Sequence, residues 1–271
     1  MANFNPPPPA NHYDANYGNF ESALYAEIRQ ESAGEDIGQN SWLTADELDG
    51  FGQRLGLAPG KTLLDVACGA GGPALRIAER TGCSVVGIEV HEQAVANAGA
   101  LARTRGLSAR AKFQVVDATG KLPFADASFD AITCIDAINH FHHRERTMAE
   151  WARLLKPGGR LLFTDPVTVT GPLTNEEIAA RSAAGVYLFV PRGYDEQAIK
   201  QCGLRLLGSE DTTVNMARVA AARQAARAAR GERLREIESP ETYERQQNFL
   251  GVAARIAEEG RLSRFLYVAE K

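Results

Sequence analysis

The stretch LLDVACGAGG, residues 63–72, decides the fold of this 271-residue chain. An apolar run leads into the carboxylate of Asp65, and Gly69, Gly71 and Gly72 follow within a few positions. Glycine tolerates positive φ angles and lets a ligand approach the backbone closely, because it has no Cβ. A buried strand followed by a glycine turn and a helix is how α/β proteins build nucleotide sites. The stretch therefore predicts such a site at the end of a parallel strand.

Apolar runs alternate with segments of helical periodicity around this stretch. Strands are predicted at residues 61–68, 84–90, 111–119, 129–138, 160–167, 204–213 and 263–271, and helices at 73–82, 92–106, 144–159, 174–185 and 195–203. Strands separated by helices favour a parallel, doubly wound, Rossmann-like sheet with right-handed crossovers. The predicted fold class is therefore α/β.

Two further helical segments are not needed for this sheet. One covers residues 15–57, before the first strand, and the other is an insert at about 215–260. We predict that they form a helical cap over the ligand edge of a core domain that spans residues 58–271. Residues 1–14, which contain the proline run at 6–9, are predicted to be an extended, mobile arm.

The composition narrows the class of protein. The net charge is −4, so no overall basic balance recruits nucleic acid or an anionic membrane. No apolar run is long enough to span a bilayer, and the N-terminus lacks the features of a secretion signal. The four cysteines form no C-x-x-C pair, which favours free thiols in a reducing cytoplasm. We expect a cytoplasmic protein that is a monomer or a homodimer.

Acidic residues recur where the predicted strands end. Asp65, Glu89 and Asp117 end the first three strands, and Asp136 lies at the end of the fourth. Four carboxylates at one edge suit a ligand with a ribose diol, an exocyclic amine and a cationic group. A dinucleotide site would require G-x-G-x-x-G, whereas residues 69–74 read GAGGPA and lack the third glycine. An NAD-dependent oxidoreductase is disfavoured, because Asp65 would also repel a pyrophosphate.

Residues 61–167 resemble the class I S-adenosylmethionine (SAM) methyltransferases in LLDVACGAGG, GIEV, VVDATGKLPFADASFDAITC and LLKPGGRLLFTDP. The resemblance implies a class I methyltransferase core with SAM as its cofactor. The cofactor-binding residues that it implies are Asp65 for the amino group, Gly69 and Gly71 for the amino-acid moiety, Glu89 for the ribose hydroxyls, Asp117 for the adenine amine, Val90 and Ala118 for the adenine ring, and Ala67 in the glycine turn.

The ends of the chain narrow this resemblance. Residues 13–44 look like the N-terminal cap of small-molecule methyltransferases related to the sarcosine/dimethylglycine and phosphoethanolamine N-methyltransferases. Their fourth-strand signature, an Asp, three residues and a His, is similar to CIDAINHF, with Asp136 and His140 at that spacing. A cap tyrosine of the phosphoethanolamine enzymes has no counterpart in EDIGQNSW, so Gln39 and Trp42 are the cap residues expected to contact SAM or the acceptor.

The predicted chemistry is methyl transfer to a small-molecule acceptor, with an amine nitrogen as the preferred target. Asp136 and His140 are expected to share one face of a helical turn on the methyl side of the pocket, with His140 as a base. His142 and His143 extend this cluster, and one of them is expected to line the acceptor pocket. No metal is predicted, because no carboxylate or thiol completes a ligand set near these histidines.

Other interpretations of the site stay open. Methylation at oxygen or carbon, as in natural-product tailoring enzymes, is one alternative. A catalytically silent SAM-binding protein is another, although such a protein has no need of the polar cluster from Asp136 to His143. The Ala/Arg-rich segment at 216–238 is interpreted as a solvated helix face rather than a nucleic-acid helix, because glutamates follow and aromatic residues are lacking. An anionic acceptor could still use Arg218 or Arg223.

Overall fold

The central sheet of the computed structural model has eight strands in the order β3-β2-β1-β4-β5-β8-β7, with β6 paired to β5 off this path. The structure describes residues 12–183 and 185–271, so the proline run of the predicted arm lies outside the described residues. Helix α1 (His12–Gly18) begins before the predicted end of that arm, and residues 12–14 are therefore helical rather than extended.

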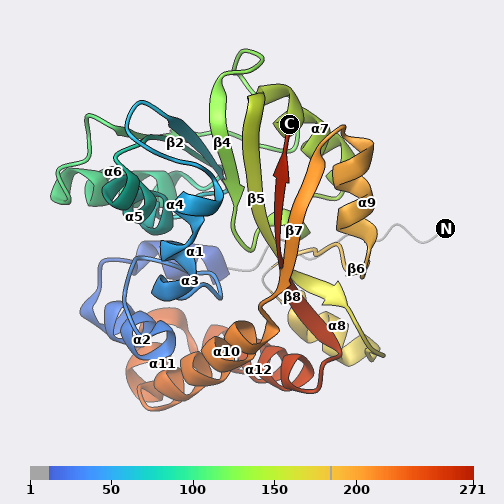
Figure 1. The fold of residues 1–271 in the computed structure, drawn as a ribbon. Coiled ribbons are helices and arrows are strands. Elements are labelled where there is room, and N and C mark those ends of the chain that lie inside the picture. Colours follow the sequence, from blue (N-terminus) through green and yellow to red (C-terminus); the bar gives the residue numbers. More distant parts are fainter. Residues whose placement is uncertain (1–11, 184) are drawn as a thin grey trace.

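The sheet is doubly wound, as predicted, but it is mixed rather than fully parallel. Its strands are β1 (Thr62–Val66), β2 (Ser84–Glu89), β3 (Ala111–Val115), β4 (Phe129–Cys134), β5 (Leu155–Val169), β6 (Val190–Pro191), β7 (Arg205–Asp211) and β8 (Leu262–Glu270). Strands β1 to β5 pair in parallel, whereas β8 runs antiparallel to both β5 and β7. The chain leaves β7 and re-enters β8 at the same end of the sheet, so β8 has to run in the opposite direction (Figure 1).

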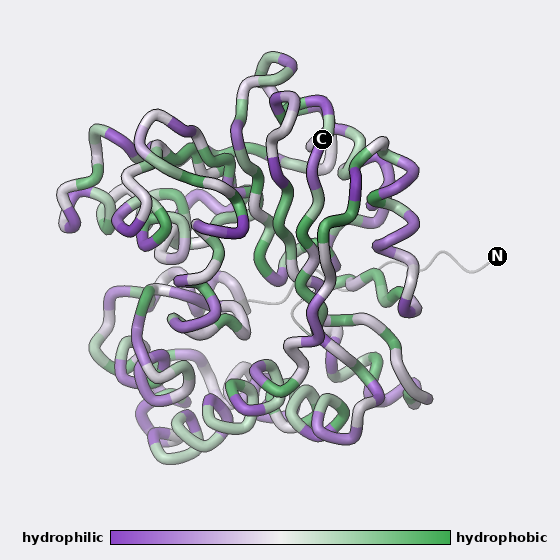
Figure 2. Tube along the Cα trace, viewed as in Figure 1, coloured by the Kyte–Doolittle hydropathy of each residue, from purple (hydrophilic) through white to green (hydrophobic). Residues whose placement is uncertain are grey.

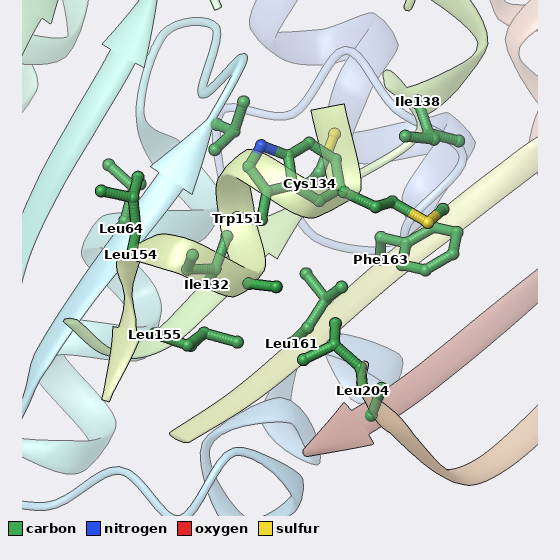
Figure 3. Close-up of a cluster of buried hydrophobic side chains, with 14 of the residues drawn as sticks. Leu64, Ile132, Cys134, Ile138, Trp151, Leu154, Leu155, Leu161, Phe163 and Leu204 are labelled. Carbon is green, nitrogen blue, oxygen red and sulfur yellow. The ribbon is translucent and has the colours of Figure 1, made fainter. Parts of the chain in front are cut away.

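Helices cover both faces of the sheet. Helices α5 (Gly72–Thr81) and α6 (Glu92–Thr104) lie on one side, and α7 (Arg144–Leu154) and α9 (Tyr194–Gln201) lie on the other (Figure 1). Successive side chains of a strand point to opposite faces of the sheet. Leu63 therefore packs in the cluster under α5, and Leu64 packs in the cluster under α7. Figure 3 shows the cluster under α7, which includes Trp151. Burial on both faces explains why the central strands are continuous apolar runs.

The glycine turn joins β1 to α5 through a left-handed backbone. Ala67, Gly69 and Gly71 have φ angles of 55°, 53° and 76°. Helix α5 starts after Gly71 and closes at Gly82, whose φ is 75° and whose N–H donates to the carbonyl of Ala78. This confirms the predicted helix end at that glycine.

Segments from the two ends of the chain lie side by side below the sheet (Figure 1). They are α1, α2 (Ala23–Ala33), α3 (Ala45–Asp49) and α4 (Phe51–Arg54) from the N-terminal part, and α10 (Thr213–Ala228), α11 (Gly231–Glu238) and α12 (Pro240–Glu258) from the insert, with α8 (Asn175–Arg181) beside them. Helix α2 packs on α10 and α11 through Leu24 and Ile28 against Ala226 and Leu234. We call this helical layer the cap.

A buried polar contact also joins the two parts of the cap. The Arg227 guanidinium pairs with Glu238 at 2.6 Å, and the Tyr25 hydroxyl donates to the same carboxylate. In Figure 2 hydrophobic stretches run along the central strands of the sheet, and the cap helices alternate between hydrophilic and hydrophobic residues. Within the described ranges, the longest helices are too polar to cross a bilayer, and no segment qualifies as a membrane span.

Candidate active site

A pocket of about 420 Å³ lies between the carboxyl ends of β1 to β4 and the cap. Its size is within the range of small-molecule and cofactor sites, roughly 300–1,000 Å³. All four predicted acids, Asp65, Glu89, Asp117 and Asp136, contribute to its lining. Residues 38–41 and helix α1 supply the opposite wall. The strand ends therefore meet at one site, as the pattern of acids predicts.

Asp65 is a buried carboxylate with one hydrogen-bond donor. The hydroxyl of Thr133 on the neighbouring strand β4 donates to its Oδ1 at 2.7 Å. Burial raises the pKa of Asp65 to about 7, despite the hydrogen bond from Thr133 and with a further contribution from Glu89. An incoming cationic amino group would stabilise the charged form of this carboxylate. The structure thus provides a place that favours a cation at the end of β1.

Glu89 is held by backbone donors at the end of β2. Its Oε2 accepts from the N–H of Gly69 at 3.1 Å, and its Oε1 accepts from Val90 at 2.8 Å and His91 at 3.1 Å. These contacts fix the carboxylate, and Oε2, which accepts only one of them, keeps lone-pair capacity for a ligand hydroxyl. The adjacent Val90 side chain is 65% exposed, which is unusual for valine and leaves an apolar surface at the mouth of the pocket.

Asp117 lies beyond the end of β3 and is exposed at the pocket mouth. The backbone N–H of Thr119 donates to its Oδ1 at 2.9 Å and lowers the pKa of the carboxylate. Ala118 lines the pocket beside it. The carboxylate is therefore charged at neutral pH and available to an amine donor.

Some residues of the glycine turn line the pocket, and others pack against neighbouring elements. Ala67 and Gly69 line the pocket. The structure places Gly71 outside the lining, where a Cβ would come within 2.8 Å of the Ala98 side chain and the Phe113 ring. The absence of a Cβ at Gly71 therefore serves the close packing of the turn on α6 and β3, and not ligand approach as predicted.

Asp136 does not orient His140, so the predicted helical turn between them is wrong. The backbone of Asp136 is left-handed, with a φ of 52°, and only Ile138–His140 form a short 3₁₀ turn, η1. The Asp136 carboxylate instead accepts from Arg264 Nε and Thr164 Oγ1, both at 2.7 Å, and from the Trp42 backbone N–H at 2.8 Å. It joins the sheet to the cap.

His140 lines the pocket and pairs with a tyrosine of α1. Its Nε2 is 3.0 Å from the hydroxyl of Tyr13. Burial, with smaller contributions from His142 and Arg181, lowers the pKa of His140 to about 4. Burial also raises the pKa of Tyr13 well above its usual value. At neutral pH both groups are therefore uncharged, and together they form a neutral pair that can accept or pass a proton.

Of the other residues predicted for the site, Gln39 lines the main pocket, whereas His142 and His143 do not. Gln39 lines the main pocket, but its amide already bonds the Ile37 N–H at 2.9 Å and the Glu35 carbonyl at 3.1 Å. His142 and His143 are exposed and line neither this pocket nor its neighbour, because the chain turns outward before α7. The Nε2 of His142 lies 3.2 Å from the Val186 carbonyl oxygen.

A second, smaller cavity of about 90 Å³ adjoins the first on the cap side. Tyr13, Asn40, Ser41 and Asp136 contribute to the lining of both. Trp42 lies in this second cavity rather than in the main pocket. Of the two arginines considered for an anionic acceptor, Arg223 lines this cavity and Arg218 is exposed to solvent.

Several lining residues have no counterpart among the predicted ones. Those with polar side chains include Tyr13, Tyr17, Asn40, Ser41 and His91. The first two occupy positions i and i+4 of α1, with their rings stacked at 6.1 Å. The spacing Y-x-x-x-Y was the available signal, since it places both rings on one helix face. In the part of the chain that the structure describes, no group of three His, Cys, Asp or Glu side chains could hold a metal ion.

Comparisons with known proteins agree on the class of protein that this fold and pocket define. A methyltransferase-domain family model matches residues 64–163. A 27-O-demethylrifamycin SV methyltransferase from Amycolatopsis mediterranei is 30% identical over 201 residues, which cover 70% of this chain and 74% of that protein. The chain therefore belongs to the SAM-dependent methyltransferases, which confirms the resemblance seen in the sequence. SAM is the cofactor of this family.

Other relatives and solved structures differ in length and in named reaction. Methyltransferase GfsG of Streptomyces halstedii is 41% identical over 121 residues, which cover 45% of this chain. This chain spans only 43% of GfsG, and 43% of a sterol 24-C-methyltransferase from Gibberella zeae. Further relatives are named as O- and N-methyltransferases, among them phosphoethanolamine N-methyltransferase 1 of Zea mays.

Two solved structures share the fold at low identity. Phosphoethanolamine N-methyltransferase 2 from Haemonchus contortus, in complex with phosphomonomethylethanolamine and S-adenosylhomocysteine, has a TM-score of 0.79 at 20% identity, over 96% of this chain and 60% of that chain. A Galdieria sulphuraria protein assigned as a sarcosine dimethylglycine methyltransferase has a TM-score of 0.73 at 21% identity, over 83% of this chain and 84% of that chain.

Proposed function

We propose that this protein transfers a methyl group from SAM to a nitrogen or oxygen atom of a small-molecule acceptor. The observation that carries the proposal is the order of polar groups along the sheet edge. Because the strand order is β3-β2-β1-β4, Asp117, Glu89, Asp65 and the Tyr13–His140 pair follow one another across the pocket. An elongated ligand lying along this edge meets three carboxylates and then the neutral pair.

This order supports a proposed role for each residue toward one part of the cofactor. We propose that Asp117 accepts from the adenine amine, and that Val90 and Ala118 flank the ring. Glu89 accepts from the ribose hydroxyls, and Asp65 receives the amino group. Ala67 and Gly69 leave room for the amino-acid moiety, since neither carries a bulky side chain. With this assignment the residues that would surround the methyl-bearing part of the cofactor lie near the end of β4, beside His140.

SAM supplies an activated methyl group on a sulfonium when it is bound. The contribution of the protein is then alignment of the acceptor with that group, and holding two reactants in place can account for about 7–11 kcal/mol of a barrier. His140 is uncharged at neutral pH because burial lowers its pKa to about 4. It can therefore take a proton from the acceptor directly or through the Tyr13 hydroxyl 3.0 Å away.

An amine nitrogen is the first candidate for the acceptor atom, because the Asp-x-x-x-His spacing resembles that of N-methyltransferases. The amine would react in its uncharged form, since the buried guanidinium of Arg181 lies near the neutral pair and disfavours an ammonium group. An oxygen is the second candidate. Its support is the neutral Tyr13–His140 pair, which suits a hydroxyl acceptor, and the O-type name of the relative from Amycolatopsis.

The test is turnover with SAM that carries a ¹³C-labelled methyl group, against a panel of small amines and phenols. We expect S-adenosylhomocysteine to form in step with a labelled product, whose methyl carbon resonance distinguishes nitrogen from oxygen. His143→Ala serves as the matched control, because His143 is exposed and lines neither cavity. Tight binding of S-adenosylhomocysteine with no product from any acceptor would favour the catalytically silent SAM-binding protein instead.

A further inference from the structure

The second cavity is small, polar and rich in hydrogen-bond donors. Its volume is about 90 Å³, against about 420 Å³ for the main pocket, so it suits one functional group of an acceptor rather than a whole acceptor. Its charged lining residues are Arg29, Asp136, Arg181, Arg223 and Arg227. The cavity opens beside Tyr13 and Asp136, which also line the main pocket. A group held there would belong to a molecule lying next to the cofactor.

Arg181 is the feature of this cavity that structural roles do not explain. The residue is 1% exposed, and its only hydrogen bond in the described ranges is a 3.4 Å contact from Nη2 to the Pro166 carbonyl. Its Nε and Nη1 are buried without a hydrogen-bond partner. Burying an unpaired cation is costly, and proteins normally pair such a group. The guanidinium therefore has donors to offer to a ligand.

The surrounding charges do not neutralise Arg181. Arg29 pairs with Asp36, Arg227 pairs with Glu238, and Asp136 is paired by Arg264. Among residues 12–183 and 185–271, Arg181 and Arg223 take part in no ion pair, and Arg223 donates to the Asn40 and Ser41 carbonyls instead. Two cations thus remain without a carboxylate partner in one cavity.

Other lining atoms point to the same chemistry. The unpartnered buried atoms in this lining include Arg227 Nε and Gln246 Nε2 as donors, and Asn139 Oδ1 as an acceptor. With the two nitrogens of Arg181, donors outnumber acceptors by four to one. A site with this balance is complementary to a group that only accepts hydrogen bonds.

Aromatic rings hold the Arg181 guanidinium in position. Its Cζ lies 4.8 Å from the centroid of the Phe249 ring, 5.6 Å from that of Trp42 and 5.8 Å from that of Tyr187. Contacts with ring faces attract the cation but leave its N–H groups in the ring plane of the guanidinium free to donate. The side chain is therefore preorganised for a ligand in that cavity.

We infer that the second cavity binds an oxyanion of the methyl acceptor, with Arg181 as its main donor and Arg223 as a second positive charge. This inference rests on the proposed function, because it places the acceptor beside the cofactor. It defines the acceptor class as small molecules that carry a carboxylate or a phosphate-like group near the methylated atom. Guanidinium groups are the usual partners of both kinds of oxyanion in proteins.

The test is calorimetric titration of the protein saturated with S-adenosylhomocysteine. The probes are matched pairs of an acid and its neutral amide, benzoate with benzamide and phenylacetate with phenylacetamide, and phenylphosphonate separates a phosphate-type site from a carboxylate-type site. We expect at least one acid to bind about tenfold or more tightly than its neutral partner. Arg181→Met should abolish that preference, and Arg181→Lys, which keeps a cation, should retain part of it.

Arg218→Met is the matched control, because it removes an exposed arginine from the same cap and should leave the preference intact. The apo form of Arg181→Met should melt at or above the wild-type temperature, since the substitution removes an unpaired buried charge. Equal affinities for every acid and its neutral partner, or an acid preference that survives Arg181→Met, would overturn the inference. Failure of S-adenosylhomocysteine to bind in the first step would overturn the proposed function instead.

Discussion

The main pocket and the second cavity differ in the charges of their key residues and in how they are built. We call the main pocket the proposed cofactor half of the site and the second cavity the proposed acceptor half. The cofactor half uses carboxylates, Asp65, Glu89 and Asp117, each placed by the end of one parallel strand. The acceptor half uses the guanidinium groups of Arg181 and Arg223, placed by helices of the cap. The first arrangement is local to each strand, whereas the second exists only after distant segments have packed together. In the proposed assignment, residues of the core therefore bind the cofactor and residues of the cap select the acceptor.

Asp136 lies at the boundary between these halves and links them. Its carboxylate pairs with Arg264, and the Trp42 N–H of the cap donates to it. Arg264 also pairs with Glu47 of α3 at 2.7 Å. Side chains of this network are nearly inaccessible, with exposures of 0% for Arg264 and 4% for Asp136. Asp136 therefore has an ion-pair partner, whereas the three cofactor acids take part in no ion pair within the described residues.

The largest expected effect separates this linking acid from the cofactor acids. Asp136→Asn should lower the free energy of unfolding by about 3 kcal/mol, because it removes one partner of a buried ion pair. Urea denaturation measures this loss. Asp117→Asn, which changes an exposed carboxylate, should stay within about 0.5 kcal/mol of wild type. Equal stability of the two variants would mean that Asp136 is not a structural link.

The next largest effect tests the proposed role of His140 as a base. His140→Ala should lower kcat by about 10²-fold, as expected for loss of a positioned base, with the affinity for S-adenosylhomocysteine nearly unchanged. Steady-state kinetics and calorimetry measure the two quantities. His143→Ala should leave both at wild-type values, because that side chain is exposed and lines neither cavity. A His140→Ala enzyme with normal kcat would place the base elsewhere in the cap.

A smaller effect concerns the pH dependence of the cofactor half. The pKa of Asp65 in the folded protein, about 7, lies above its ordinary value, so the folded state binds more protons than the unfolded chain between about pH 4 and pH 7. The contribution of Asp65 to the free energy of unfolding therefore decreases as pH rises through that window. Asp65→Asn should raise the melting temperature of the apo protein at pH 8, and the gain should shrink at pH 5.

Binding provides the second measurement of the same group. The affinity of wild type for S-adenosylhomocysteine should weaken by up to about tenfold per pH unit below pH 7, as Asp65 becomes protonated. The Asp65→Asn variant should bind weakly with little dependence on pH between 5.5 and 7.5. Asp117→Asn should keep the wild-type pH profile. A wild-type affinity that does not change over this range would contradict the role given to Asp65.

The core could be predicted from sequence because each of its signals is local. Continuous apolar runs indicate the central strands, and glycines with positive φ at Gly69 and Gly82 fix the turn and the helix end. The acids at the strand ends meet because parallel strands all end at one edge. The direction of β8 was not predictable in this way, since it depends on where the 213–258 helices return to the sheet.

The acceptor half could not be predicted to the same degree. The left-handed backbone of Asp136 breaks the expected i, i+4 relation with His140, and nothing in the residue types requires that conformation. Tyr13 reaches His140 across 127 positions of sequence, and Arg181 is left without an ion pair while Arg29 and Arg227, which line the same cavity, pair with Asp36 and Glu238. Such relations depend on tertiary packing, which residue spacing does not encode.

The most direct test of the central claim is calorimetric titration of wild type and Glu89→Ala with S-adenosylhomocysteine and with NAD. Wild type should bind S-adenosylhomocysteine with an affinity on the micromolar scale and give no binding heat with NAD. Glu89→Ala should weaken the binding of S-adenosylhomocysteine by about 1.5–3 kcal/mol, the range for losing hydrogen bonds to a charged group. NAD binding without S-adenosylhomocysteine binding, or an affinity unchanged by Glu89→Ala, would contradict the claim that the acids at the strand ends hold SAM.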